Sequence, residues 1–291
     1  MTTTNKPLGV YVHIPFCMRK CPYCDFLSFE NESALVHKVY VKALMKELEA
    51  HGEVYGNDYT VNTLFIGGGT PSLLLPSMVK DIADAVKDNF NMDINSEITI
   101  EANPRTLSPA KLSGYLEAGV NRISIGVQSF NDLVLKILGR PHTAEDGYSA
   151  CRMAREAGFK NINLDLMFGI PGQHGETWME TLMVAVGLSP EHVSFYSLTI
   201  EEGTKFHDMF ETGPYAKLPD EVEREMHAMA VKELSGAGHQ RYEISNAAKP
   251  GHECRHNIKY WTFEDFTCVN STEPNKLHCF KCRRNRKILQ V

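Results

Sequence analysis

The sequence of 291 residues has no run of eighteen apolar residues, so no stretch predicts a membrane-spanning helix. It also has no excess of positive charge, because 30 Lys and Arg accompany 36 Asp and Glu for a net charge of −6. That balance argues against nucleic acid as a partner. The first seven residues are polar and resemble neither a signal peptide nor an Arg-rich transit peptide. These absences favour a cytoplasmic protein.

Cysteine is sparse except in one stretch, where three of the eight cysteines occupy Cys17-Met-Arg-Lys-Cys21-Pro-Tyr-Cys24. Such clustering is typical of metal ligands in a reducing compartment rather than of disulfides. No second C-x2-C pair lies nearby to complete a structural zinc site. Three thiolates can hold a [4Fe–4S] cluster and leave its fourth iron open to a ligand. Three ordinary thiols are the alternative, which the clustering disfavours.

Strand and helix patterns alternate six times along the chain. Short apolar runs predict strands at residues 9–14, 61–66, 97–101, 121–126, 161–166 and 192–198. Amphipathic patterns follow the first five of them, and residues 219–234 predict one further, strongly charged helix. This alternation indicates a parallel sheet with right-handed crossovers. Six units are too few to close an eight-stranded barrel, so we expect an open (β/α)6 partial barrel of the α/β class.

Polar and glycine residues follow the predicted strands at the point where each one ends. The cysteines follow the first strand and Gly67–Gly69 the second, Glu101 closes the third, Gln128 follows the fourth, and Asp165 lies at the end of the fifth. Each has an ordinary explanation alone, such as a turn, a helix cap or a bond to a neighbouring amide. Since cofactors bind at the carboxyl ends of barrel strands, their joint placement predicts a cofactor site.

The cysteine spacing resembles that of the radical SAM superfamily. The resemblance implies that the open iron chelates S-adenosylmethionine (SAM), whose S–C5′ bond the reduced cluster splits to give a 5′-deoxyadenosyl radical. Further motifs are similar to the oxygen-independent coproporphyrinogen III oxidase group, which includes the oxidase itself and the HemW branch of heme chaperones. These motifs are Tyr11-Val-His-Ile-Pro-Phe-Cys17, Gly67-Gly-Gly-Thr-Pro-Ser72, Gly126-Val-Gln-Ser-Phe130, Leu138-Gly-Arg140 and Asp165-Leu-Met-Phe-Gly-Ile-Pro171.

Motif by motif, the resemblance implies cluster ligands at Cys17, Cys21 and Cys24. It implies SAM contacts at Tyr11, Gly68, Gly69, Thr70, Glu101, Gln128, Arg140 and Asp165. These residue types suit the ligand, because glycine permits close backbone approach and carboxylates accept bonds from ribose hydroxyls. An arginine fork can pair with the methionyl carboxylate.

Two features separate the branches of this group. The oxidases extend the motif to C-x3-C-x2-C-x-C, whereas Phe26 occupies the last position here, as in HemW-like proteins. The run His256-Asn-Ile-Lys-Tyr260-Trp261 is similar to a HemW signature implicated in heme binding. The resemblance therefore implies that His256 contacts heme. Without the family, a hydrogen-bonded loop histidine would be the better interpretation.

Three functional hypotheses follow. The first is a HemW-like chaperone that binds the cluster, SAM and heme, takes electrons from a donor, and passes heme to apo-proteins such as respiratory enzymes. The second is an enzyme of porphyrin biosynthesis that decarboxylates coproporphyrinogen III, against which the missing fourth cysteine counts. The third is an inactive remnant. Whether the protein is an enzyme therefore stays open.

The resemblance stops after Trp261, and the composition then changes. We expect a core barrel over residues 1–215, the start of a C-terminal region over 216–261, and an atypical basic tail over 262–291. Residues 268–291 contain six Lys and Arg and one acidic residue, Glu273. A frameshift or truncated gene model is the favoured explanation, with a disordered natural end as an alternative. A third is a zinc or second-cluster site formed by Cys254, Cys268, Cys279 and Cys282, with His252 and His256 as further ligands.

Overall fold

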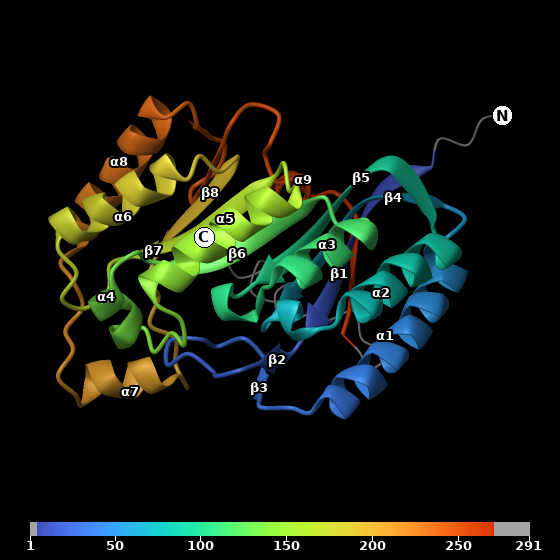
Figure 1. Ribbon diagram of the computed structural model, residues 1–291, viewed down its shortest axis with the longest axis horizontal. Helices are drawn as coiled ribbons and strands as arrows, with labels where there is room; N and C mark the ends of the chain where they lie inside the picture. Colours follow the sequence, from blue (N-terminus) through green and yellow to red (C-terminus); the bar gives the residue numbers. More distant parts are fainter. Residues whose placement is uncertain (1–4, 271–291) are drawn as a thin grey trace.

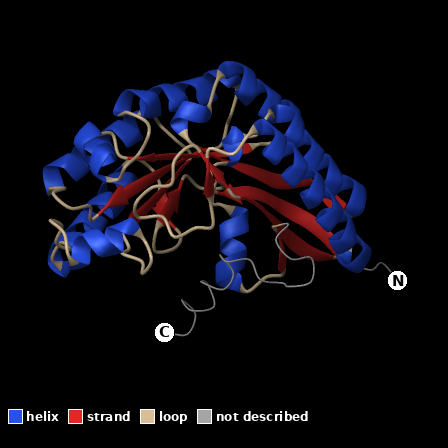
Figure 2. Cartoon of the chain, turned by 90° about the horizontal axis from the view of Figure 1, so that it is seen from below, coloured by secondary structure: helices blue, strands red, loops and turns tan. Residues whose placement is uncertain are grey.

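The computed structural model describes residues 5–270, which form an open half-barrel with strands inside and helices outside (Figures 1 and 2). Six parallel strands follow one another in chain order, which confirms the predicted open α/β architecture. They are β1 (Lys6–Ile14), β4 (Tyr59–Gly68), β5 (Asn91–Ala102), β6 (Arg122–Gln128), β7 (Ile162–Phe168) and β8 (His192–Ser197).

The six longest helices that the sequence patterns predict are present, namely α1 (Ala34–Tyr55), α2 (Pro76–Asn89), α3 (Pro109–Glu117), α5 (Ala144–Ala157), α6 (Gly175–Gly187) and α8 (Asp220–Gly236). Five short elements add to that set: α4 (Asp132–Ile137), α7 (Lys205–Glu211), α9 (Arg255–Thr262) and the two 3₁₀ turns η1 (Pro71–Leu73) and η2 (Pro104–Thr106). Within residues 5–270, no helix is both long and apolar enough to cross a membrane.

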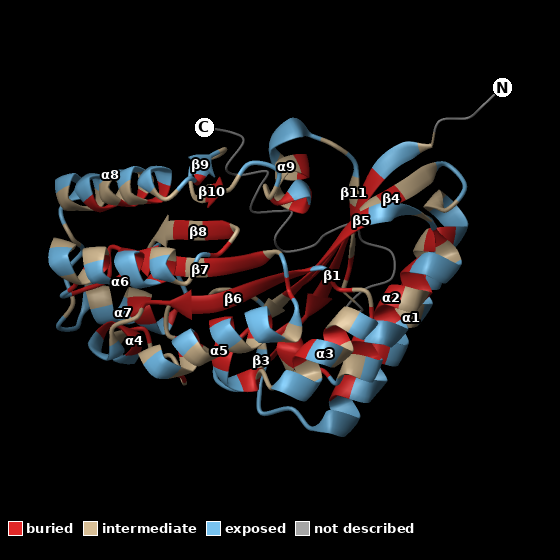
Figure 3. Ribbon diagram, turned by 45° about the horizontal axis from the view of Figure 1, so that its top comes forward, coloured by how far each residue is buried: buried red, intermediate tan, exposed pale blue. Residues whose placement is uncertain are grey.

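The central strands are mostly buried (Figure 3). Their residues alternate between the apolar core and the cavity. In β6, Ile123, Ile125 and Val127 belong to the apolar core shared with the outer helices. The intervening residues, Arg122 and Ser124 among them, face the barrel interior and line a cavity. This period of two is that of any strand, and it places polar side chains inside without weakening the apolar layer.

Both edges of the sheet carry strands that the sequence patterns do not predict. β11 (Phe266–Val269) pairs in parallel with β1, while β10 (Asn246–Ala248) runs antiparallel to β8 and pairs with β9 (Gln240–Arg241). β11 lies within the expected tail of residues 262–291, and its Val269 is fully buried against the core. The tail boundary at residue 262 and the division at residue 215 stay predictions. Cys279, Cys282 and the basic segment beyond residue 270 lie outside the described residues.

Glycine allows α1 and α2 to meet closely. A Cβ atom at Gly52 would lie 2.6 Å from the backbone oxygen of Asn89, a contact that real Cβ atoms do not make. At Gly187, at the end of α6, no described atom outside its chain neighbours and its own helix backbone lies within 4 Å of a hypothetical Cβ. These two helical glycines therefore differ in packing while sharing the same intrinsic preference.

We predict opposite effects for alanine at these two positions. Gly52→Ala forces the two helices apart and lowers the free energy of unfolding by about 1–3 kcal/mol. Gly187→Ala keeps it unchanged or raises it by up to about 1 kcal/mol through helix propensity. Urea unfolding followed by circular dichroism measures both values, and equal shifts in the two variants would contradict the packing argument.

Candidate functional site

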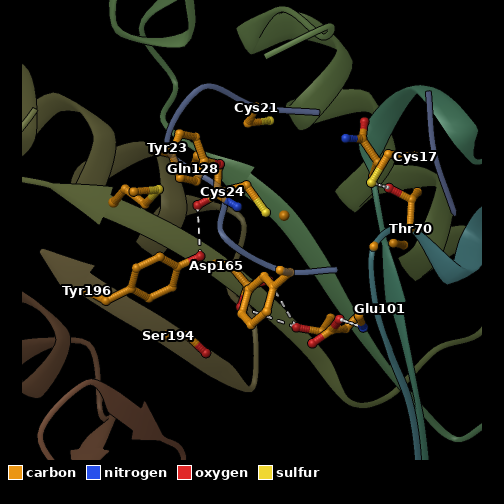
Figure 4. A pocket seen from close by; sticks show the side chains of 18 of the residues that line it. Cys17, Cys21, Tyr23, Cys24, Thr70, Glu101, Gln128, Asp165, Ser194 and Tyr196 are labelled. Carbon is orange, nitrogen blue, oxygen red and sulfur yellow. Dashed lines mark hydrogen bonds between the residues drawn. The ribbon is translucent and has the colours of Figure 1, made fainter. Parts of the chain in front are cut away.

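A cavity of about 800 Å³ opens at the carboxyl ends of the parallel strands. Figure 4 shows the three cysteines on one side of it, with Glu101, Asp165, Ser194 and Tyr196 across from them. Of the residues that the sequence singles out, those lining the cavity are Cys17, Cys21, Cys24, Gly68, Gly69, Thr70, Glu101, Gln128, Arg140 and Asp165. Tyr11 and His256 do not line it.

The cysteine loop is fastened at its start, where β2 (Phe16–Cys17) pairs with β3 (Phe29–Glu30). The Thr70 hydroxyl donates a hydrogen bond to the Cys17 thiol at 3.7 Å, and Arg140 Nη1 donates to the Cys21 thiol at 3.5 Å. Burial raises the pKa of the Cys17 thiol, and it raises the pKa of Cys24 to about 11. Without a bound cation the thiols of Cys17 and Cys24 therefore stay protonated near neutral pH. A metal, in contrast, deprotonates its cysteine ligands.

The donor set suits an iron–sulfur cluster better than a single ion. Among the described residues, no three His, Cys, Asp or Glu side chains are close enough to share one metal ion. A [4Fe–4S] cube offers a separate iron to each thiolate, so the three cysteines fit three of its corners. No fourth cysteine of the described chain lines the cavity, which leaves one iron for SAM. The Arg140 guanidinium beside Cys21 compensates part of the negative charge.

The glycine run brings the end of β4 directly under the cysteine loop. Gly68 has φ +119°, and its N–H donates to Glu101 Oε2 at 2.8 Å. A Cβ atom at Gly69 would lie 2.7 Å from the Phe16 carbonyl oxygen and 3.1 Å from the Cys17 sulfur. Only glycine allows this approach, so the backbone here can reach a ligand on the open iron.

The carboxylate of Asp165 lies deep in the opposite wall. It accepts hydrogen bonds from Ser124 Oγ at 3.2 Å and from Asn163 Nδ2 at 2.7 Å. Desolvation, with the charge of Glu101 as a smaller contribution, raises the pKa of the Asp165 carboxyl to about 6. Two neighbouring carboxylates in a partly dry wall can accept both hydroxyls of a ribose. These roles of Glu101 and Asp165 stay predictions.

Gln128 and Arg140 are held by other parts of the wall. Gln128 ends β6 with φ +66°, unusual for a residue other than glycine, and its Oε1 accepts the Tyr196 hydroxyl at 3.0 Å. Arg140 Nη2 donates to the Gly126 carbonyl at 2.7 Å, while its buried Nε has no partner. Strained backbone at a cofactor wall is a common feature of functional sites. Because the Nε atom of Arg140 has no hydrogen-bond partner, its guanidinium can still bind an anionic group.

Tyr11 and His256 lie behind the wall rather than on it. Tyr11 is 1% exposed and stacks on Phe65, which itself lines the cavity. His256 is also 1% exposed, and its ring nitrogens bond to the hydroxyls of Thr63 and Tyr260 at 2.8 and 2.9 Å. The sequence could identify the His256 motif but not which of its side chains face inward. Those that do are Asn257, Tyr260 and Trp261.

The lower half of the cavity contains residues that sequence reasoning missed. They alternate along the strands and are Arg122, Ser124, Asn163 and Ser194. The sequence signal for two of them is a polar side chain shortly before a predicted rim residue: Asn163 lies two residues before Asp165, and Ser124 lies four before Gln128. That pattern distinguishes an interior face only after the sheet topology is known.

Comparison with known proteins agrees with this geometry. The model of the radical SAM superfamily matches residues 11–185, and the heme chaperone HemW of Escherichia coli is 42% identical over 271 residues, covering 93% of this chain and 70% of its own length. The chain belongs to the HemW family of the radical SAM superfamily. The HemW protein of Haemophilus influenzae is 40% identical over 275 residues, with the same coverage of both chains.

The solved structure of coproporphyrinogen III oxidase HemN from Escherichia coli has the same fold. It superposes with a TM-score of 0.77 at 25% identity, covering 91% of this chain and 63% of that enzyme. The chain thus spans less than two thirds of HemN and about 70% of the HemW relatives. Membership of a radical SAM family implies a [4Fe–4S] cluster and SAM as cofactors, and the cavity contains the side chains to hold both.

Single cysteine substitutions test the cluster site. Cys17→Ala, Cys21→Ala and Cys24→Ala each remove one iron ligand, so anaerobically reconstituted protein loses the broad visible absorbance of the cluster. Cys151→Ala is the matched control, because Cys151 lies on the core-facing side of α5. Iron and sulfide analysis gives the stoichiometry. A variant of the first three that keeps a full cluster would refute the assignment.

Asp165→Asn tests how much the desolvation of the Asp165 carboxylate destabilises the folded protein. Because the pKa of Asp165 is raised in the folded state, its ionisation lowers the free energy of unfolding of the protein as the pH rises from about 4 to about 6. The variant therefore raises the free energy of unfolding by about 1–3 kcal/mol at pH 7.5, and this gain disappears below about pH 4. The exposed substitution Asp88→Asn controls for net charge. A gain independent of pH would show that desolvation of the charged carboxylate is not its cause.

Proposed function

We propose that this protein is a heme chaperone that binds a [4Fe–4S] cluster, SAM and heme and delivers heme to apo-proteins. The observation that carries the proposal is the position of α9, whose Asn257, Tyr260 and Trp261 line the same cavity as the three cysteines. The HemW relatives, which are named heme chaperones, support it.

The chain's own residues have distinct tasks in this proposal. Cys17, Cys21 and Cys24 hold the cluster, which together with SAM supplies one-electron chemistry when bound. Gly68 and Gly69 let the backbone approach SAM, and the wall carboxylates orient its ribose. Tyr260 and Trp261 offer flat apolar surface to a porphyrin, and Trp261 is 43% exposed beside the cavity.

His256 has two possible tasks that an experiment can separate. Histidine is a common axial ligand of heme iron, and ligation here requires its ring to give up a bond to Thr63 or Tyr260. Alternatively, these two bonds hold α9 and the Tyr260 ring in place. The first task makes His256 a heme ligand, and the second makes it a positioning residue.

An oxidase acting on coproporphyrinogen III is the second candidate. The likeness to HemN favours it, since the two folds superpose closely. Phe26 argues against it, because this residue lines the cavity where the oxidase motif has its fourth cysteine. Release of CO2 from coproporphyrinogen III under reducing, anaerobic conditions would support the enzyme.

The remaining partners follow from the proposed chemistry. A reducible cluster needs an electron donor, and a chaperone needs heme-accepting apo-proteins, for which respiratory enzymes are our candidates. Free thiols that serve as iron ligands require a reducing compartment, so we assign the protein to the cytoplasm.

An anaerobic heme titration tests this function. Wild-type protein with its cluster gives a saturable Soret band, and His256→Ala weakens heme binding about tenfold or more. Thr63→Val removes a partner of His256 without changing the ring. A Soret position unchanged in Thr63→Val but shifted in His256→Ala indicates a ligand, whereas equal losses in both indicate a positioning residue. His207→Ala, on α7, is the control.

Absence of saturable heme binding while the cluster is intact would overturn the chaperone proposal. If that protein also releases CO2 from coproporphyrinogen III, the oxidase becomes the better assignment. If it does neither and also cannot retain iron after reconstitution, an inactive remnant is indicated.

A further inference from the structure

Arg122 is a buried cation that the site described above does not use. It begins β6, its side chain is only 2% exposed, and it lines the cavity. Its Nε atom is buried and has no hydrogen-bond partner, and none of the ion pairs found in residues 5–270 includes it. A buried donor that makes no hydrogen bond is costly, and nearby charges do not replace that missing bond.

The nearby carboxylates are already engaged elsewhere. Glu97 accepts the backbone N–H groups of Arg255 and His256, each at 3.1 Å, at the start of α9. Asp165 accepts from Ser124 and Asn163. Both carboxylates contribute a favourable field at Arg122, but no oxygen of either lies within ion-pair distance. The fork is therefore available to an anion that enters from the cavity.

The position of Arg122 separates it from the rim. Gln128 lies at the other end of β6, six residues further along and about 20 Å away at the rise of a strand. Arg122 thus marks the floor of the cavity, with Ser124 and Asn163 as the polar side chains above it. Of the residues expected to contact SAM, Gln128 and Arg140 lie toward the rim. Glu101 and Asp165 lie lower, at the level of Ser124.

The floor and the proposed heme surface of Tyr260 and Trp261 border the same cavity. Glu97, which influences Arg122, contacts the first turn of α9, while Tyr260 and Trp261 lie in its last turn. α9 has eight residues and is about 12 Å long. A flat macrocycle lying on those aromatic rings therefore has its flexible carboxylate arms within reach of the floor.

We propose that Arg122 forms a carboxylate subsite at the floor of the cavity and that it binds a propionate of the heme. This inference rests on the proposed heme-binding function and deepens it. The planar fork matches a carboxylate with two parallel hydrogen bonds, and the surrounding low dielectric strengthens them. Arg122 then selects tetrapyrroles with free propionates and orients them relative to α9.

The test compares heme with heme dimethyl ester, in which both propionates are esterified. Full-length protein with its cluster is titrated anaerobically with each ligand, as wild type, Arg122→Gln and Arg122→Lys. Wild type binds heme about tenfold or more tighter than the ester. Arg122→Gln loses that preference through weaker heme binding, and Arg122→Lys keeps part of it. The exposed Arg152→Gln on α5 is the charge-matched control.

SAM affinity, measured in the same variants, identifies the source of the carboxylate. If Arg122→Gln weakens SAM binding and leaves the preference for heme over its ester, the subsite binds the methionyl carboxylate and the proposal is wrong. It is also wrong if wild type binds both forms of heme equally, because the guanidinium is then only hydrated.

The comparison of heme with heme dimethyl ester in wild-type protein still tests whether the propionates contribute to binding if Arg122→Gln fails to fold. If wild-type protein does not bind heme at all, both the proposed function and this inference are wrong. If wild type binds heme but shows no dependence on the propionates or on Arg122, this inference alone fails.

Discussion

The polar wall of the cavity depends on the two-residue period of the buried parallel strands. One face of each strand must be apolar because helices cover it, as Ile123, Ile125 and Val127 show in β6. The other face is free to be polar because it borders a cavity rather than the core. The same seven residues thus contribute both to the stability of the barrel and to a ladder of polar groups from floor to rim.

This constraint explains what the sequence could predict. Periodicity identified the six parallel strands and their helices, and the rule that ligands bind at the carboxyl ends of strands located Glu101 and Asp165 correctly on one cavity. The capping box of Thr143 and Asp146 and the left-handed Gly158, which begin and end α5, are signals of the same local kind. These features are local, so a single sequence contains the information for them.

The features that the sequence could not predict depend on contacts between distant segments. β11 is too short to be recognised, yet it becomes a strand because the edge of β1, from the opposite end of the described chain, is available to it. The buried orientation of His256 depends on Thr63 in β4, and the polar floor depends on which face of β6 turns inward. Arg122 alone resembles a strand-flanking surface residue, and only topology makes it buried.

Several residues of the cavity wall lower the free energy of unfolding of the protein. Asp165 is held in a wall that raises its pKa, Arg122 is desolvated without a direct partner, and Gln128 has a left-handed backbone. Each of these costs free energy that a bound ligand can return by supplying hydrogen bonds or charge. Because these three costs all fall on the cavity wall, the interior is best understood as a surface shaped for ligands.

The likeness to an oxidase and the membership of a chaperone family are compatible on this scaffold. HemN is a radical SAM enzyme and this chain matches the radical SAM superfamily, and the shared fold places the three cysteines of this chain over the rim of a half-barrel. In this chain the cavity is completed by parts that a strand pattern does not determine, namely Phe26 in the cysteine loop and the α9 side chains. Function on this fold therefore depends on what completes the cavity rather than on the sheet that forms its wall.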